Sequence, residues 1–311
     1  MVCIEACSLC QLNCPDCYMR RDYDACIIKS GYLKFEDFKN FINRNPYIEN
    51  IELSLSGEIF LNPELLEIIK YAYKKGIKLT AFNGVNFNNV SDEILEALVK
   101  YKFIGITLSI DGTTNETYQI YRRNGNLNNV INNINKLNKF KEKHNSKYPI
   151  LQWQYIVFEH NEHEISKVAE FQKQHKIDRV FFKQAWNSSG FSTKARNEIR
   201  NSRIKQTSDL EIHEIFKENS INLCLYPWLK PQINWDGRLL GCCCSTHSDL
   251  NTNVFKIGLK NALNSPKALF MKNVLSGKQI ADESLHCLHC GFYNNIKMNN
   301  TYINEKHIKF I

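Results

Sequence analysis

Residues 10–17 read Cys10-Gln11-Leu12-Asn13-Cys14-Pro15-Asp16-Cys17, so three cysteines lie within eight residues. Three thiolates are one short of the four ligands of a closed zinc site. No fourth ligand is near, because Cys26 has no partner at a matching spacing and His144 lies far along the chain. A [4Fe–4S] cluster held by three cysteines leaves one iron open to a small molecule. The spacing favours such an open cluster, and a zinc or structural site is the alternative.

The composition sets limits on the kind of protein. The chain has 311 residues, of which 43% are hydrophobic, and its formal net charge is +8. No run of eighteen apolar residues or signal-peptide pattern is present, so we expect a cytoplasmic protein with no membrane segment. Twelve cysteines are more than a cytoplasmic chain needs for packing, which indicates metal binding or catalysis. The charge fits an anionic cofactor or substrate and gives little support to nucleic-acid binding.

Hydrophobic periodicity alternates between strand and helix over the first 185 residues. We expect strands at 2–7, 48–56, 77–82, 103–110, 150–158 and 178–183. We expect helices at 33–43, 65–75, 91–101, 127–144 and 162–175. Six such alternations predict an α/β fold with a parallel sheet, curled into a partial (β/α)6 barrel. The chemistry should then lie at the carboxyl ends of the strands.

Short motifs follow the first four predicted strands in order, and together they resemble the radical S-adenosylmethionine (radical SAM) superfamily. The cysteine loop matches the family's CxxxCxxC pattern, with the aromatic Tyr18 after the third cysteine. The other matches are Ser56-Gly57-Glu58 to the GGE motif, Asn83-Gly84 to the TNG turn, Ser109-Ile110-Asp111-Gly112 to the SIDG segment, and Tyr121-Arg122-Arg123-Asn124-Gly125 to the stretch after it. The sequence departs from the family where Ser56 replaces glycine and Ile59 replaces proline. The resemblance covers residues 1–185.

The resemblance implies two cofactors and a set of ligands. Cys10, Cys14 and Cys17 would hold a [4Fe–4S] cluster whose open iron binds SAM. The residues implied to contact SAM are Tyr18, Ser56, Gly57, Glu58, Asn83, Ser109, Asp111 and Arg122. Simpler roles stay open for several of them. Gly57 can turn the chain and Glu58 can be a loop acid, whereas Ser109 and Asp111 can cap a helix.

The C-terminal third contains a second cysteine pattern. Cys224, Gly237 and Cys242 form C-x12-G-x4-C, and residues 287–290 form a CxxC pair. Asp236-Gly237 predicts a tight hairpin, and residues 257–275 predict a helix. Four thiolates can close around zinc. Behind a radical SAM barrel, the layout instead resembles a twitch domain, the short form of the SPASM module. That resemblance implies an auxiliary [4Fe–4S] cluster fully ligated by Cys224, Cys242, Cys287 and Cys290.

The chain therefore divides into three predicted parts: a barrel at 1–185, a basic linker or lid at 186–222, and a twitch-like domain with a β-hairpin and a helix at 223–311. The basic segment is a solvated face or a lid over an anionic substrate. Cys243 and Cys244 follow Cys242 directly. They are buried packing residues, or one of them is a catalytic hydrogen-atom donor as in radical epimerases.

A closed auxiliary cluster accepts an electron rather than binding substrate, which favours oxidation. The layout is most similar to aminocyclitol dehydrogenases, and we expect a radical SAM oxidoreductase acting on a small sugar, aminocyclitol or nucleotide sugar. A flavodoxin- or ferredoxin-type protein would supply electrons. The alternatives are a peptide maturase, a radical epimerase and, outside the enzymes, an iron–sulfur carrier. The SAM motifs argue against an iron–sulfur carrier, because a carrier does not need them.

Overall fold

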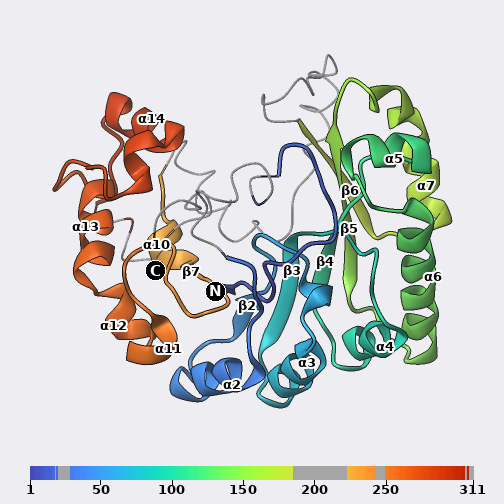
Figure 1. Cartoon of the computed structure of the whole chain (residues 1–311), viewed down its shortest axis with the longest axis horizontal. Coiled ribbons are helices and arrows are strands. Elements are labelled where there is room, and N and C mark those ends of the chain that lie inside the picture. Colours follow the sequence, from blue (N-terminus) through green and yellow to red (C-terminus); the bar gives the residue numbers. More distant parts are fainter. Residues whose placement is uncertain (18, 20–28, 185–222, 242–248, 305–306, 308–311) are drawn as a thin grey trace.

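The computed structural model describes residues 1–17, 19, 29–184, 223–241, 249–304 and 307 (Figure 1). The basic segment 186–222 lies outside this part, with Leu223 the first described residue after it. Tyr18, Cys242, Cys243 and Cys244 also lie outside the described residues, so their predicted roles stay predictions. Among the described helices, none combines the length and the apolar character that crossing a bilayer requires.

A seven-stranded sheet forms the centre of the molecule, and every strand pair in it is parallel. The strands are β1 (Val2–Ile4), β2 (Asn50–Glu52), β3 (Lys78–Val85), β4 (Gly105–Ser109), β5 (Ile150–Val157), β6 (Arg179–Gln184) and β7 (Gln232–Ile233). Their order is β6-β5-β4-β3-β2-β1-β7. The predicted α/β fold with an open parallel sheet is confirmed, and the sheet gains one strand beyond the six predicted alternations.

Helices connect successive strands and cover one side of the sheet (Figure 1). They are α2 (Phe35–Arg44), η1 (Ile59–Leu61), α3 (Leu65–Lys74), α4 (Asp92–Lys100), α5 (Asn115–Tyr121), α6 (Leu127–Lys143), η2 (Glu162–Lys167) and α7 (Val168–Gln174). Their ends follow capping rules. The Ser91 side chain accepts a hydrogen bond from the N–H of Ile94 at the start of α4, and Gly76 follows α3 with a φ of +74°.

The two faces of the sheet differ in chemistry because side chains alternate along each strand. One face carries Ile51, Leu79, Ile106, Leu108 and Leu151, which join the helices in a single apolar core. The opposite face carries buried polar side chains: Glu52, Thr80, Thr107, Ser109, Gln152 and Gln154. The inside of the curled sheet is therefore polar, an environment suited to polar ligands or to internal hydrogen bonds.

The C-terminal part begins with α10 (Tyr226–Leu229) and then supplies β7, which pairs with β1 through the register Cys3↔Gln232 and Ile4↔Ile233. The predicted hairpin turn follows, with an antiparallel bridge between Ile233 and Leu239. The predicted hairpin included a strand at the position of β7, but its pairing with β1 was not predicted.

Beyond the turn lie α11 (Val254–Ile257), α12 (Leu259–Leu263), α13 (Pro266–Leu275), η3 (His286–His289) and α14 (Gly291–Asn299). The helical stretch predicted over 257–275 is confirmed as mostly helical, but it is divided among the end of α11, α12 and α13. Gly258 has a φ of +84° between α11 and α12, and Pro266 begins α13. A left-handed glycine and a proline each interrupt a helix, which explains the division.

Candidate functional site

The cysteine loop leaves the carboxyl end of β1 and is closed at its base by Ser8 and Gly31. The N–H of Ser8 donates to the Gly31 carbonyl at 2.9 Å, and the N–H of Gly31 donates to Ser8 Oγ at 3.0 Å. Trp235, from the turn after β7, donates through Nε1 to the Lys29 carbonyl at 2.8 Å. Residues far apart in the sequence thus hold the two ends of the loop together.

Cys10, Cys14 and Cys17 lie in one cluster with Leu12, Tyr121 and Phe158. Two of the three sulfurs have a nitrogen donor beside them. Asn86 Nδ2 lies 3.6 Å from Cys10 Sγ, and Arg122 Nη1 lies 3.9 Å from Cys14 Sγ. Donors of this kind tune the reduction potential of a cluster held by thiolates. The chemistry of this donor set suits a [4Fe–4S] cluster, and the ligand role of the three cysteines stays a prediction.

Gly57 lies where the loop after β2 crosses the chain that leads into the cysteine loop. A Cβ atom at this position would lie 2.3 Å from the Cys7 carbonyl oxygen and 2.7 Å from that of Leu9. The next residue, Glu58, donates its N–H to the same Leu9 carbonyl at 2.8 Å. Only glycine permits this approach, so Gly57 sets the spacing between the cysteine loop and the SGE segment.

Glu58 is buried, with 1% of its surface exposed. Its carboxylate accepts hydrogen bonds from the N–H of Asn86 at 2.5 Å and from the N–H of Phe60 at 3.4 Å. Burial raises the pKa of this carboxyl to about 7, against the lowering effect of those N–H donors. Glu58 is therefore no solvated loop acid, and its contact with SAM remains a prediction.

Asn86 connects Glu58 to the cysteine loop, and no sequence motif predicted it. Its side chain exchanges hydrogen bonds with Gln11, at 2.8 Å from Gln11 Nε2 to Asn86 Oδ1 and at 3.3 Å in the reverse direction. It lies three residues after the predicted Asn83 motif, in a stretch with several asparagines. Nothing in that stretch distinguishes Asn86 from its neighbours.

Asn83 and Ser109 occupy the ends of β3 and β4. Asn83 Nδ2 donates to the Ser54 carbonyl at 2.6 Å, which ties β3 to β2. Ser109 is buried, and its Oγ would lie 2.7 Å from a Cβ on Gly84, a residue with a φ of +116°. Both predicted residues therefore lie at the carboxyl edge of the sheet, and a glycine at position 84 is required for the close approach of β3 to Ser109.

Asp111 and Arg122 form a buried ion pair, with 2.6 Å between Asp111 Oδ2 and Arg122 Nε. The other oxygen of Asp111 accepts the N–H of Ile156 at 2.8 Å. Burial alone would lower the pKa of Arg122. The negative charges of Asp111 and Cys14 have the larger effect, so the pKa of Arg122 is raised. Asp111 thus orients Arg122 toward Cys14. A ribose contact by Asp111 stays a prediction.

The described cysteines of the C-terminal part lie in or next to short helices. Cys224 precedes α10, Cys287 lies in η3, and Cys290 caps the start of α14. Cys242, the predicted fourth ligand, lies outside the described residues. No three His, Cys, Asp or Glu side chains in the described part of the chain are arranged to hold a single metal ion. The second ligand set therefore stays a prediction.

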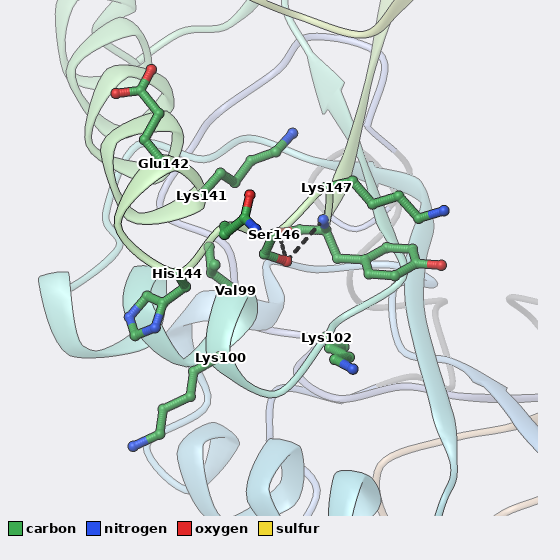
Figure 2. A pocket seen from close by; sticks show the side chains of 10 residues that line it. Val99, Lys100, Lys102, Lys141, Glu142, His144, Ser146 and Lys147 are labelled. Carbon is green, nitrogen blue, oxygen red and sulfur yellow. Dashed lines mark hydrogen bonds between the residues drawn. The ribbon is translucent and has the colours of Figure 1, made fainter.

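A separate pocket of about 880 Å³ lies at the amino ends of β4 and β5, away from the candidate site (Figure 2). It is lined by Val99, Lys100, Lys102, Lys141, Glu142, His144, Asn145, Ser146, Lys147 and Tyr148. Lys141 lies 3.4 Å from Asp178, and Glu142 lies 2.8 Å from Lys176, so part of its charge is compensated. We assign it no role in the chemistry of the opposite edge.

A family model described as the radical SAM superfamily matches residues 4–171. The chain belongs to this superfamily. No curated protein matches the sequence. Radical SAM membership implies SAM and a [4Fe–4S] cluster, as the motifs predict.

Solved structures show the same fold. Streptococcus suis SuiB bound to S-adenosylmethionine aligns with a TM-score of 0.63 at 14% identity, over 94% of this chain and 70% of SuiB. Native anSMEcpe with bound AdoMet aligns with a TM-score of 0.63 at 14% identity, over 94% of this chain and 87% of anSMEcpe. The likeness, at this identity, concerns the fold alone.

Proposed function

We propose that this radical SAM enzyme binds its catalytic [4Fe–4S] cluster through Cys10, Cys14 and Cys17. The observation that carries the assignment is the convergence of Asn86 and Arg122 on two of these sulfurs from the loops beyond β3 and β4. When bound, the cluster and SAM supply a 5′-deoxyadenosyl radical that abstracts hydrogen from a substrate carbon. The protein's own residues hold the two cofactors in place and exclude water.

The SGE segment is the proposed binding element for the methionine part of SAM. Gly57 brings this segment against residues 7–9, and Glu58 lies buried beside Asn86. A carboxylate here can accept a charge-assisted hydrogen bond from the SAM ammonium group. Ser56, Asn83, Ser109 and Asp111, together with Tyr18 beyond the described part, are the further proposed SAM contacts.

The proposed reaction is the oxidation of a small hydroxylated molecule, with an auxiliary [4Fe–4S] cluster as electron acceptor. The ligands would be Cys224, Cys242, Cys287 and Cys290. The polar inner face of the sheet supports a hydroxylated substrate, because Thr107, Gln152 and Gln154 line it along β4 and β5. A flavodoxin- or ferredoxin-type protein is the proposed electron donor.

A peptide substrate is the second candidate. SuiB has been solved bound to precursor peptide SuiA, and anSMEcpe with a Cp18Cys peptide. Epimerisation, with Cys243 or Cys244 as hydrogen donor, is a third outcome of the same radical chemistry. Turnover in deuterated water separates them once a substrate is known. An oxidised product two hydrogens lighter supports the dehydrogenase, whereas an unchanged redox state with one solvent deuterium on carbon supports the epimerase.

The cluster assignments are tested without a substrate. A variant with Cys10, Cys14 and Cys17 all changed to Ala should lose SAM cleavage yet retain about four irons per chain at the auxiliary site, as in a [4Fe–4S] cluster. Elemental analysis of the reconstituted protein measures iron and zinc together. Absence of iron from this variant refutes the auxiliary cluster, and zinc in its place identifies a structural site. Release of 5′-deoxyadenosine by the wild type excludes a simple iron–sulfur carrier.

A further inference from the structure

Two glutamates point from neighbouring strands into the polar inside of the sheet, and they differ in the hydrogen-bond donors around them. Glu52, on β2, accepts hydrogen bonds from Ser54 Oγ at 2.5 Å, from Thr80 Oγ1 at 2.7 Å and from the N–H of Phe82 at 2.9 Å. Glu5, directly after β1, is completely buried, and neither of its oxygens accepts a hydrogen bond from the residues that the structure describes. Burying an ionised carboxylate without donors is costly.

The neighbour of Glu5 across the sheet is Asn234. The N–H of Glu5 donates to the Ile233 carbonyl at 2.9 Å and extends the β1–β7 register, Ile4↔Ile233, by one position. Residues paired in register project to the same face of a sheet. Asn234 is also completely buried, and its Oδ1 has no donor among the described residues.

The orientation of the Asn234 amide is fixed by Asp236. Asn234 Nδ2 donates to Asp236 Oδ1 at 2.9 Å, and Asp236 is itself paired with Arg238 Nε at 2.7 Å. A carboxylate accepts only, so the Asn234 amide must present its nitrogen there and turn Oδ1 away. Three buried oxygens, two from Glu5 and one from Asn234, therefore lie on one face, and none of them accepts a hydrogen bond from the described residues.

We propose that Glu5 is held as a protonated carboxylic acid that donates to Asn234 Oδ1 and positions the Leu55–Gly57 turn above it. A proton on Glu5 supplies the missing donor and removes the buried charge. The Ser56 hydroxyl and the N–H groups of Leu55, Ser56 and Gly57 lie close enough to lower the carboxyl's pKa, although none has the geometry of a hydrogen bond to it. Burial outweighs them and raises that pKa to about 7.

The consequence is a link between the C-terminal part and the SAM site. β7 places Asn234 against Glu5, and Glu5 lies against the turn that Gly57 holds next to residues 7–9. Glu5 is a positioning residue, because it acts on SAM through that turn. This effect on SAM rests on the proposed function, whereas the protonation of Glu5 does not.

Few other titratable groups act on Glu5. Cys3 and Cys7 lie on its own segment, and burial raises the pKa of each thiol to about 12, so both stay neutral. The turn residues of the β2 side, Leu55 to Gly57, do not titrate, and Lys230 near β7 acts on Cys3. Asp236 reaches Glu5 only through the Asn234 amide.

The first test compares matched substitutions of the two glutamates in the full-length, anaerobically reconstituted enzyme. Glu5→Gln reproduces the neutral acid, so its denaturation midpoint should equal or exceed that of the wild type at pH 8. Glu52→Gln replaces an acceptor surrounded by donors, so its midpoint should fall. The infrared carbonyl band of a protonated carboxyl at pH 6 should decrease in Glu5→Gln. The proposal is overturned if Glu5→Gln is as unstable as Glu5→Ala and that band is unchanged, the result for an ionised Glu5 with bridging water.

The second test measures SAM affinity by calorimetry. Glu5→Ala should weaken SAM binding roughly tenfold, the effect of about one lost hydrogen bond, and Glu5→Gln should restore it. Equal affinity in all three proteins refutes the positioning role while leaving the protonation result intact. Failure of the wild type to bind SAM refutes the proposed function instead, and the stability and infrared measurements still decide the state of Glu5.

Discussion

Glu58 accepts the backbone N–H of Asn86 at 2.5 Å, and the Asn86 side chain in turn lies 3.6 Å from the sulfur of Cys10. A buried carboxylate at the end of β2 is therefore joined to a proposed cluster ligand through one residue of the loop after β3. SAM binding should therefore depend on the Glu58 carboxylate, and the reduction potential of the cluster should depend on the Asn86 side chain beside Cys10.

Glu58→Gln should weaken SAM binding without removing the first cluster. The substitution takes away the charge that would accept from the SAM ammonium and turns an amide toward the Asn86 N–H. Calorimetry gives the affinity and elemental analysis gives the iron content. Glu93→Gln makes the same substitution at the exposed start of α4, and this control variant should bind SAM as the wild type does. Unchanged SAM affinity would assign Glu58 a purely structural role.

Asn86→Asp should shift the reduction potential of the SAM-binding cluster to a more negative value. The change replaces a donor beside Cys10 Sγ by an acceptor with negative charge, which disfavours adding an electron. Anaerobic redox titration measures the potential. Asn89→Asp adds the same charge at an exposed position of the same loop and should shift it less. Equal shifts would show that the contact with Cys10 has no specific effect.

Gly57→Ala should reduce iron incorporation at the cysteine loop. The added methyl group would lie 2.3 Å from the Cys7 carbonyl oxygen, so residues 7–9 must move. Overpacking of this kind costs about 1–3 kcal/mol. Gly291→Ala is the control, because its Cβ meets no atom within 4 Å. Iron content and unfolding free energy should change in the first variant and stay constant in the second.

Arg122→Met should destabilise the protein by about 3–5 kcal/mol, since it leaves Asp111 buried without its partner. Adding Asp111→Asn should recover part of the loss. The exposed pair Lys136–Asp92 is the control, and Lys136→Met should cost about 0–1 kcal/mol. Denaturant unfolding measures all four proteins. A double variant no more stable than Arg122→Met alone would contradict direct coupling.

Stability should decrease as the pH rises from about 5 to about 7. Glu58 and Glu5 both have pKa values raised to about 7 by burial, above the value of about 4.3 for an unfolded glutamate. A raised carboxyl pKa stabilises the fold fully below the unfolded pKa, and this contribution is lost as the pH rises through the folded pKa. Each group adds a slope of at most about 1.4 kcal/mol per pH unit. The double variant Glu5→Gln/Glu58→Gln should show a flatter pH profile in denaturant unfolding, and an unchanged profile would contradict both shifts.

The sequence predicted the first six strands and the long helices because their burial follows simple periods. Ser91 and Gly76 marked helix ends by capping chemistry that acts locally. The sequence predicted the hairpin that contains β7 but not the pairing of β7 with β1, because β1 lies more than two hundred residues earlier. Glu5 and Asn234 were not predicted for the same reason: they become neighbours through the register between β1 and β7, which exists only in the folded chain. Asp111 appeared as an isolated motif residue, whereas the structure pairs it with Arg122.

The placement of β1 between β2 and β7 has a consequence for synthesis. The strand that carries the cysteine loop is translated well before β7, yet one of its two edges stays bare until residues 232–233 have been translated. Until then Trp235 cannot hold Lys29, and the base of the loop is held by the contacts that residues 6–8 make with residues 29–33. Contacts of such high sequence separation form late in folding. Iron insertion at Cys10, Cys14 and Cys17 should therefore follow, not accompany, translation of the N-terminal half.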